Sequence, residues 1–323
     1  MWKISIFTLP HFHIYCMAEL STILKYIDDF AVKEGKTVSL KDYDTDYDHK
    51  NLSKEDGETL LQLGIKRLSE LQDKFYADKR YSLLTVIQAM DAAGKDGVVK
   101  HVMNGVNPQG VKVTSFKVPT ALELSHDFLW RHYLALPAKG EIGIFNRSHY
   151  ENVLVTRVHP EYILKENIPG IKNTTDITAA FWEKRYKQIN RFEKTLSDNG
   201  TVIIKFMLHV SKKEQKKRFL ERIDNPAKNW KFSMGDVKER ALWKEYRNAY
   251  DDLLTNTSKD YAPWYVIPAD DKWFARLAVA TILFRTLEKL DLNYPTVTEE
   301  MKADLQKGKQ ELMSENGKEK DND

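Results

Sequence analysis

Residues 82–106 read SLLTVIQAMDAAGKDGVVKHVMNGV and carry the clearest structural signal in the chain. The apolar run from Ser82 to Met90 predicts a buried strand, and the run from Val98 to Asn104 has a helical pattern. The DAAGKDG turn between them is rich in Ala and Gly, so successive backbone N–H groups can point at an anion beside the helix N-terminus. Lys95 would add a direct positive charge. The unit therefore predicts a phosphate-binding loop.

The loop departs from the usual G-x-x-x-x-G-K-[ST] spacing at two positions. Ala89 stands in place of the first glycine, and Asp96 replaces the Ser or Thr after Lys95. Asp91 lies inside the loop, where a carboxylate would repel a bare phosphate, so we expect it to hold Mg²⁺. The alternative is an ordinary turn capped by Asp91. The loop residues expected to contact phosphate are Ala92, Ala93, Gly94, Asp96 and Gly97.

The rest of the chain alternates strand and helix patterns, which predicts an α/β fold. Further strands are expected at 111–118, 141–145, 201–210 and 264–268, and further helices at 53–78, 125–134, 176–196 and 272–290. Such alternation implies a mostly parallel five-stranded sheet covered by helices on both faces, a three-layer αβα arrangement.

Composition divides the chain into a main domain with two flanking segments. We expect an N-terminal arm and leader at 1–50, a main domain at 51–295 with a helical lid at about 211–258, and a charged flexible tail at 296–323. The leader MWKISIFTLPHFHIYC is apolar, but Pro10, His11 and His13 interrupt it. We interpret it as an upstream start or a loosely attached arm. No apolar run is long enough to predict a membrane span.

Charge and cysteine content limit the classes of partner. Fifty Lys and Arg against 47 Asp and Glu give a formal charge of +3, so any polyanion site must be local, and general nucleic-acid binding is not expected. Cys16 is the single cysteine, which excludes an intrachain disulfide and indicates a reducing cytoplasm.

The third predicted strand ends in GIFNRSHYE, residues 143–151. Arg147 follows the strand at the edge where open α/β sheets place ligand groups; the alternative is a surface salt bridge. Asn146 stands where a Walker-type kinase usually has an acidic residue. Candidate metal carboxylates are therefore Glu151, Asp127 and Asp91.

The predicted lid is rich in cations. Arg218 and Arg222 are four residues apart, so they share a helical face and could converge on one phosphate chain. Lys231 follows them, and Lys117 with Arg131 could extend a basic groove from the loop. A solvated charged face is the alternative interpretation of this run.

Three blocks, at 88–120, 126–161 and 208–233, together resemble the family 2 polyphosphate kinases. The resemblance covers roughly Lys50 to Leu290. It implies an adenylate-kinase-like P-loop fold, a helical lid, Mg²⁺ (with Mn²⁺ as an alternative ion) and reversible phosphate transfer with inorganic polyphosphate. Asn146 in FNRS, together with Glu151, resembles the class III subgroup, which uses both AMP and ADP as acceptors.

The resemblance also carries expectations for single residues. Asp91 and Lys95 match the family's Walker A positions, Arg147 its Walker B arginine, and Arg218 and Arg222 its lid arginines. It implies a homo-oligomer and leaves guanine nucleotides open as acceptors. The leader before Met17 has no counterpart in the family pattern.

Two other functions are compatible with these residues. An ATP-dependent nucleoside or nucleotide kinase would share the fold and the loop chemistry, although the changes at Ala89 and Asp96 count against ordinary ATP binding. A non-catalytic polyanion-binding module would bind without turnover.

Overall fold

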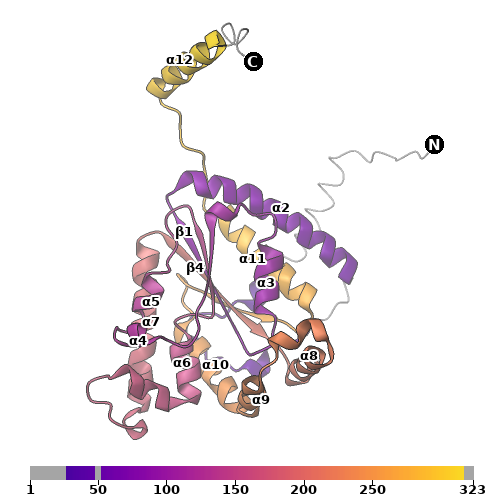
Figure 1. The fold of residues 1–323 in the computed structure, drawn as a ribbon, viewed down its shortest axis with the longest axis vertical. Helices are drawn as coiled ribbons and strands as arrows, with labels where there is room; N and C mark the ends of the chain where they lie inside the picture. The colour runs from indigo at the N-terminus through magenta and orange to yellow at the C-terminus, as the bar shows by residue number, and fades with distance from the viewer. Residues whose placement is uncertain (1–26, 48–51, 316–323) are drawn as a thin grey trace, which may run out of the picture. The chain divides into compact units, whose positions relative to one another are not determined.

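The computed structural model describes residues 27–47 and 52–315. Its centre is a five-stranded sheet with the order β2-β3-β1-β4-β5, and every strand pairing in it is parallel (Figure 1). The predicted α/β class and five-stranded sheet are therefore confirmed. The strands are β1 (Ser82–Ala89), β2 (Val111–Ser115), β3 (Ile142–Asn146), β4 (Thr201–His209) and β5 (Trp264–Pro268).

Helices cover both faces of the sheet, which gives the expected three layers. One core cluster joins the sheet to α2 (Lys54–Asp78), α3 (Lys95–Val102) and α11 (Lys272–Glu288). A second cluster lies on the opposite face with α6 (Glu151–Val158), α7 (Ala179–Asp198) and α10 (Trp243–Thr257) (Figure 1). Burial on both faces explains why the strands appear in the sequence as continuous apolar runs.

The predicted helix at 125–134 is only partly right. Within this range the structure has only the short helix α5 (Trp130–Tyr133), and another short helix, α4 (Ala121–Leu124), ends just before it. Thr120 and Glu123 form a capping box that starts α4, and the hydroxyl of Ser125 donates to the Leu122 carbonyl at its end. These local side-chain bonds compete with a continuous helix. The 3-10 helices are η1 (Asp28–Phe30), η2 (Leu40–Asp42), η3 (Pro108–Gly110), η4 (Pro160–Glu166), η5 (Thr174–Asp176) and η6 (Pro226–Lys231).

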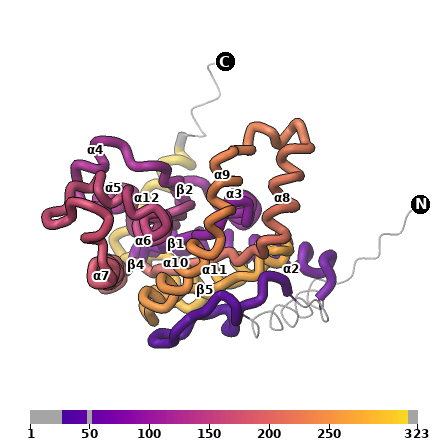
Figure 2. Tube along the Cα trace, turned by 90° about the horizontal axis from the view of Figure 1, so that it is seen from below, coloured from indigo at the N-terminus to yellow at the C-terminus, as the bar shows by residue number. Residues whose placement is uncertain are grey.

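Only part of the predicted lid projects from the sheet. Figure 2 shows α8 (Lys212–Asp224) and α9 (Met234–Ala241), with the segment between them, standing away from the strands. In contrast, α10 is packed into the core, where Tyr250, Leu253 and Leu254 are buried. The apolar side of α10 therefore belongs to a core layer, and the projecting part of the range 211–258 ends before it.

Part of the predicted arm is integrated into the core. Val32 and Leu40 are buried, and the Val32 N–H donates to the Trp264 carbonyl at 2.9 Å. The Leu40 N–H donates to Oδ1 of Asp251 at 2.7 Å. The apolar leader lies outside the described residues.

Residues 293–323 form a separate unit. Within it, α12 (Glu299–Glu315) occupies most of the segment that we expected to be a flexible tail. The remaining positions, 316–323, are not among the described residues. Across the described parts of the chain, no helix combines the length and apolar character that a membrane crossing requires.

Candidate active site

The phosphate loop connects β1 to α3. Ala92 and Gly94 have left-handed backbone, with φ of 59° and 108°. Gly94 adopts this conformation freely because it has no Cβ, whereas Ala92 carries a steric cost of about 1 kcal/mol in it. Backbone turns of this kind aim successive N–H groups into one concavity. The loop therefore suits an anion at the N-terminus of α3.

Three charged groups that the sequence singled out lie together at this loop. The Nζ of Lys95 donates to the Ala89 carbonyl at 2.9 Å. Burial lowers the pKa of Lys95, and the negative charge of Asp91 opposes that shift. Nη2 of Arg147 lies 3.5 Å from Oδ1 of Asp91. Since β1 and β3 are neighbours, their carboxyl ends bring these side chains to one edge of the sheet.

Two of the three departures from the usual kinase motifs, Asp96 and Asn146, contact each other. Nδ2 of Asn146 donates to Oδ1 of Asp96 at 2.8 Å. An aspartate at position 146 would place a second negative charge beside Asp96, whereas an amide supplies a donor. The change at one position is therefore matched by the change at the other. We did not predict this pairing; the simultaneous departure at 96 and 146 is the signal that could have indicated it.

Arg218 binds the phosphate loop itself. Its guanidinium donates to the carbonyls of Ala92 and Ala93 at 3.0 and 2.8 Å, and to those of Ala269 and Asp270 at 2.7 and 2.8 Å. Nε donates to Glu214 at 2.9 Å. A guanidinium has five N–H donors, and these contacts occupy all of them. We expected Arg218 to converge with Arg222 on one phosphate chain; in this structure its five donors bind protein groups instead.

Arg222 has a different environment, although it shares the helical face of Arg218. Its Nη1 lies 3.2 Å from Oδ2 of Asp236 and 3.4 Å from the Lys231 carbonyl. Lys231 is exposed, with its Nζ 4.9 Å from the ring centre of Trp230. Of the two lid arginines, Arg222 thus keeps donors that these contacts do not use.

Arg131 and Lys117 lie together at the far side of the loop. Nη1 of Arg131 donates to the Lys117 carbonyl at 2.8 Å and lies 3.6 Å from Glu123. The guanidinium carbon is 5.3 Å from the ring centre of Phe116. These contacts fix the Arg131 side chain, which is largely buried.

Glu151 begins α6 and is the second candidate metal ligand. Burial raises the pKa of Glu151, and the charges of Arg147 and Lys95 oppose that shift. Asp127, the third candidate, accepts a bond from the Leu129 N–H at 2.9 Å. Glu151 is half-buried, and a carboxylate whose pKa is raised by burial is a group that a cation would stabilise.

The donor set fits magnesium that arrives with phosphate. No group of three or more His, Cys, Asp and Glu side chains in the described part of the chain is arranged to hold a metal. Mg²⁺ keeps several waters and typically uses one or two carboxylates together with substrate phosphates. Asp91 and Glu151 meet that requirement, since both line one cavity.

Three cavities meet at Arg147. A groove of about 970 Å³ runs along the phosphate loop and α8. A pocket of about 300 Å³ lies between the loop, α6 and α9, and another of about 320 Å³ lies between α4, α5 and α6. Arg147 lines all three, while Asp91 and Lys95 line the first two. Arg147 also has positive φ, 62°, which is uncommon outside glycine and is a strain typical of functional sites.

An anion-binding loop at the end of a central parallel strand, beneath a projecting basic helical segment, defines the class of P-loop kinase-like proteins. The family model described as polyphosphate kinase 2 matches residues 51–295. The chain belongs to the polyphosphate kinase 2 family.

Individual relatives agree with this assignment. The chain is 49% identical over 284 residues to an ADP-polyphosphate phosphotransferase of Rhodopseudomonas palustris, covering 88% of this chain and 97% of that protein. It is 50% identical over 230 residues to an AMP/ADP-polyphosphate phosphotransferase of Meiothermus ruber, covering 71% and 80%. Polyphosphate kinase 2 from Arthrobacter aurescens TC1 matches in structure with a TM-score of 0.75 and 44% identity, over 82% of this chain and 90% of that one.

Proposed function

We propose that this protein transfers the terminal phosphate of inorganic polyphosphate to AMP and ADP, reversibly, in a magnesium-dependent reaction. The observation that carries the proposal is the position of Arg147, which lies where a basic groove meets two pockets. A donor chain in the groove and an acceptor in a pocket would then meet at one guanidinium. The names of the relatives, which include both AMP and ADP, support the same pair of acceptors.

The groove has the charge that a phosphate chain requires. Eight Lys and Arg side chains line it, against four carboxylates. The whole chain has a formal charge of only +3, so positive charge is concentrated in this groove. The cations are Lys95, Lys117, Arg147, Arg218, Arg222, Lys228, Lys231 and Lys272.

The pocket beside α5 has the character of a nucleoside site. Phe116, Phe128 and Tyr162 line it together with Val118, and its volume of about 320 Å³ is in the range of small-molecule sites. Aromatic and apolar walls suit a base, while Arg147 at the shared edge suits the acceptor phosphate. We therefore place the acceptor in this pocket.

The reaction breaks the terminal P–O bond of polyphosphate and forms a P–O bond to an acceptor phosphate oxygen, leaving a chain one unit shorter. The second pKa of a phosphate monoester is about 6, so the acceptor is already ionised at neutral pH and no general base is needed. Asp91 and Glu151 would hold Mg²⁺, which supplies neutralising charge to donor and acceptor oxygens. Lys95 and Arg147 orient the transferred group, Arg222 closes over it, and Lys231 binds the chain behind it.

Three further properties complete the proposal. The subgroup pattern of Asn146 with Glu151 supports AMP and ADP use, and guanine nucleotides stay open as acceptors. The family resemblance supports a homo-oligomer, which light scattering would measure. The single cysteine supports a reducing cytoplasmic setting.

The test is incubation of AMP with polyphosphate and Mg²⁺ without ATP, scored for ADP and ATP. Lys95→Met should lose turnover but keep its melting temperature, because Lys95 is half-buried and its surroundings already disfavour its charged form. Lys100→Met is the matched control, since Lys100 is exposed on the same helix. Phosphorylation that requires ATP would favour the ATP-dependent kinase, and binding of polyphosphate without product would favour the non-catalytic module. Full turnover by Lys95→Met would contradict the loop assignment.

A further inference from the structure

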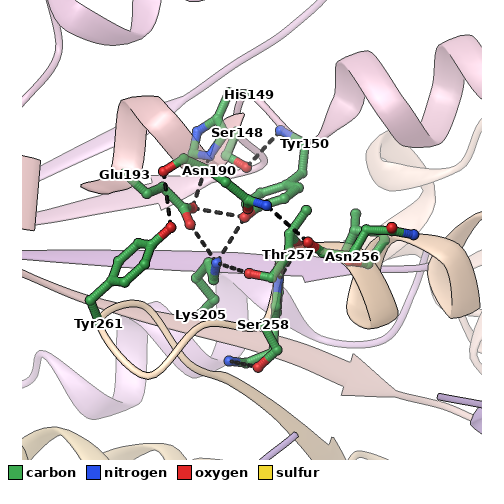
Figure 3. A network of polar contacts seen from close by, with 12 residues as sticks. Ser148, His149, Tyr150, Asn190, Glu193, Lys205, Asn256, Thr257, Ser258 and Tyr261 are labelled. Atoms are coloured by element: carbon green, nitrogen blue, oxygen red, sulfur yellow. Dashed lines mark hydrogen bonds and ion pairs between the residues drawn. The ribbon is translucent and has the colours of Figure 1, made fainter. Parts of the chain in front are cut away.

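The turn that carries Arg147 and Glu151 continues into a buried polar network. Ser148, His149 and Tyr150, the three residues between them, are each fully buried. Figure 3 shows these three residues converging with Glu193 of α7 and Lys205 of β4. The residues that these bonds join do not line the cavities described above. The network therefore reaches the site only through the turn, and its role in the proposed reaction would be indirect.

The network is saturated around Lys205. Its Nζ donates to the Tyr150 hydroxyl and the Thr257 carbonyl at 2.8 Å each, and to Oε2 of Glu193 at 2.5 Å. An ammonium group has three donors, and all three have partners. Oε1 of Glu193 accepts from the Tyr150 hydroxyl at 2.8 Å and lies 3.2 Å from Nε2 of His149. Glu193 thus ties two consecutive residues of the turn to Lys205.

A second set of bonds holds the start of the turn. The Arg147 N–H donates to the Ile87 carbonyl at 3.2 Å. The hydroxyl of Ser148 accepts from Nε2 of Gln88 at 3.0 Å and from the Tyr150 N–H at 3.2 Å. The Glu151 N–H donates to the Ser148 carbonyl at 3.0 Å. The backbone N–H of the strained Arg147 and the side chain of the next residue, Ser148, are therefore both tied to β1.

Stability alone is a weak reason for this arrangement. Burying a lysine and a glutamate costs desolvation that their attraction often only balances, and apolar residues of similar volume would frequently serve as well. Buried polar groups do specify one geometry, because each alternative position leaves a donor or acceptor unpaired. A left-handed arginine needs such surroundings to persist.

We propose that Tyr150, Glu193 and Lys205 are positioning residues, which hold the left-handed turn so that Arg147 and Glu151 face the reacting phosphates. This inference rests on the proposed function of Arg147 and Glu151. The three residues act through the turn and do not touch the substrate.

The experiment compares Tyr150→Phe with Tyr186→Phe. Tyr150→Phe removes one hydroxyl and keeps the ring against Trp264. Tyr186, buried on α7, has a hydroxyl that makes no hydrogen bond within the described residues, so its loss leaves the network intact. We expect kcat of Tyr150→Phe to fall about 10- to 100-fold, because small displacements of a catalytic group have effects of that size. KM for polyphosphate should change less than about twofold, since the other groove cations are unaffected.

Hydrogen–deuterium exchange supplies a readout that does not depend on activity. Amides of 147–151 should exchange faster in Tyr150→Phe, and those of β4 should not. Ser148→Ala, which removes a different bond of the same turn, should give the same selective effect if Tyr150→Phe does not fold.

Equal turnover and exchange in the Tyr150 and Tyr186 variants would overturn the inference. So would a loss of kcat that disappears after correction for the folded fraction. Absence of polyphosphate-dependent phosphorylation in the unaltered protein would instead overturn the proposed function, and the exchange measurement would still test the turn.

Discussion

Arg218→Ala should destabilise the folded protein as well as reduce turnover. The side chain is 4% exposed and donates five hydrogen bonds, four of them to carbonyls of the phosphate loop and of the segment after β5. Alanine would leave those carbonyls unpaired and Glu214 without its buried partner. Arg218 therefore joins α8, the loop and the end of β5 in one set of contacts.

The size of the effect follows from these contacts. Removing one partner from a buried, hydrogen-bonded charge typically costs about 3–5 kcal/mol. For a chain of this size, 1 kcal/mol corresponds to roughly 2–4 °C, so the melting temperature should fall by about 6–20 °C. Turnover should also fall, because the loop loses the bonds at Ala92 and Ala93.

Arg222→Ala is the matched comparison on the same helix. Its side chain is 22% exposed and pairs with Asp236, so stability should change by no more than about 1 kcal/mol. An arginine that meets the transferred phosphate contributes about 10³-fold or more to the rate, so turnover should fall steeply.

Thermal unfolding followed by circular dichroism measures the stability of both variants. Turnover is measured as initial rates at one temperature for both, about 15 °C lower than the melting temperature of the less stable variant. The reasoning fails if Arg218→Ala melts with the unaltered protein and loses only turnover. That result would support the role predicted from helical spacing, in which Arg218 and Arg222 converge on one phosphate chain.

Two further predictions concern charge. Glu151→Gln should stabilise the protein by about 1 kcal/mol at about pH 7 while lowering turnover, because functional groups in unfavourable environments commonly cost stability. Burial raises the folded-state pKa of Glu151 above that of an ordinary glutamate, so the ionised side chain destabilises the native state. The gain from Glu151→Gln should therefore fade as pH falls toward the ordinary glutamate pKa. Urea titrations across pH would contradict this if the gain grew instead. The apparent affinity for polyphosphate should fall about 10- to 100-fold between roughly 50 and 200 mM salt, because bound phosphates release counterions. KM for AMP serves as the comparison, and a polyphosphate KM that stays flat would show that the groove is misassigned.

The sheet could be predicted because its strands are apolar on both faces. β1 begins and ends within one residue of its predicted range, and β5 has the bounds predicted for it. The two short helices at 121–134 could not be predicted from periodicity, since side-chain bonds of Thr120 and Ser125 set where the first of them begins and ends. The burial of α10 also escaped prediction, because polar residues on its outer side made the whole range 211–258 resemble a lid.

The candidate site was predictable where one rule of topology applies. Asp91, Lys95 and Arg147 meet because loops after adjacent parallel strands leave the sheet at the same edge. Arg218 was different: spacing of four residues assigns a helical face, but it cannot say which carbonyls that face meets. The contributions of Gln215, whose Nε2 donates to the Asp91 carbonyl at 2.9 Å, and of Asp236 were missed for the same reason.

The site concentrates features that disfavour folding. Ala92 and Arg147 have left-handed backbone, and burial shifts the pKa values of Lys95 and Glu151 toward their neutral forms. Such features persist only where the surrounding contacts over-determine the geometry. Two saturated clusters meet that condition, since the guanidinium of Arg218 binds the loop at Ala92 and the Lys205 network binds the turn after Arg147. Each strained residue is thus paired with a buried cation whose donors are all in use, Ala92 with Arg218 directly and Arg147 with Lys205 through the turn that follows it.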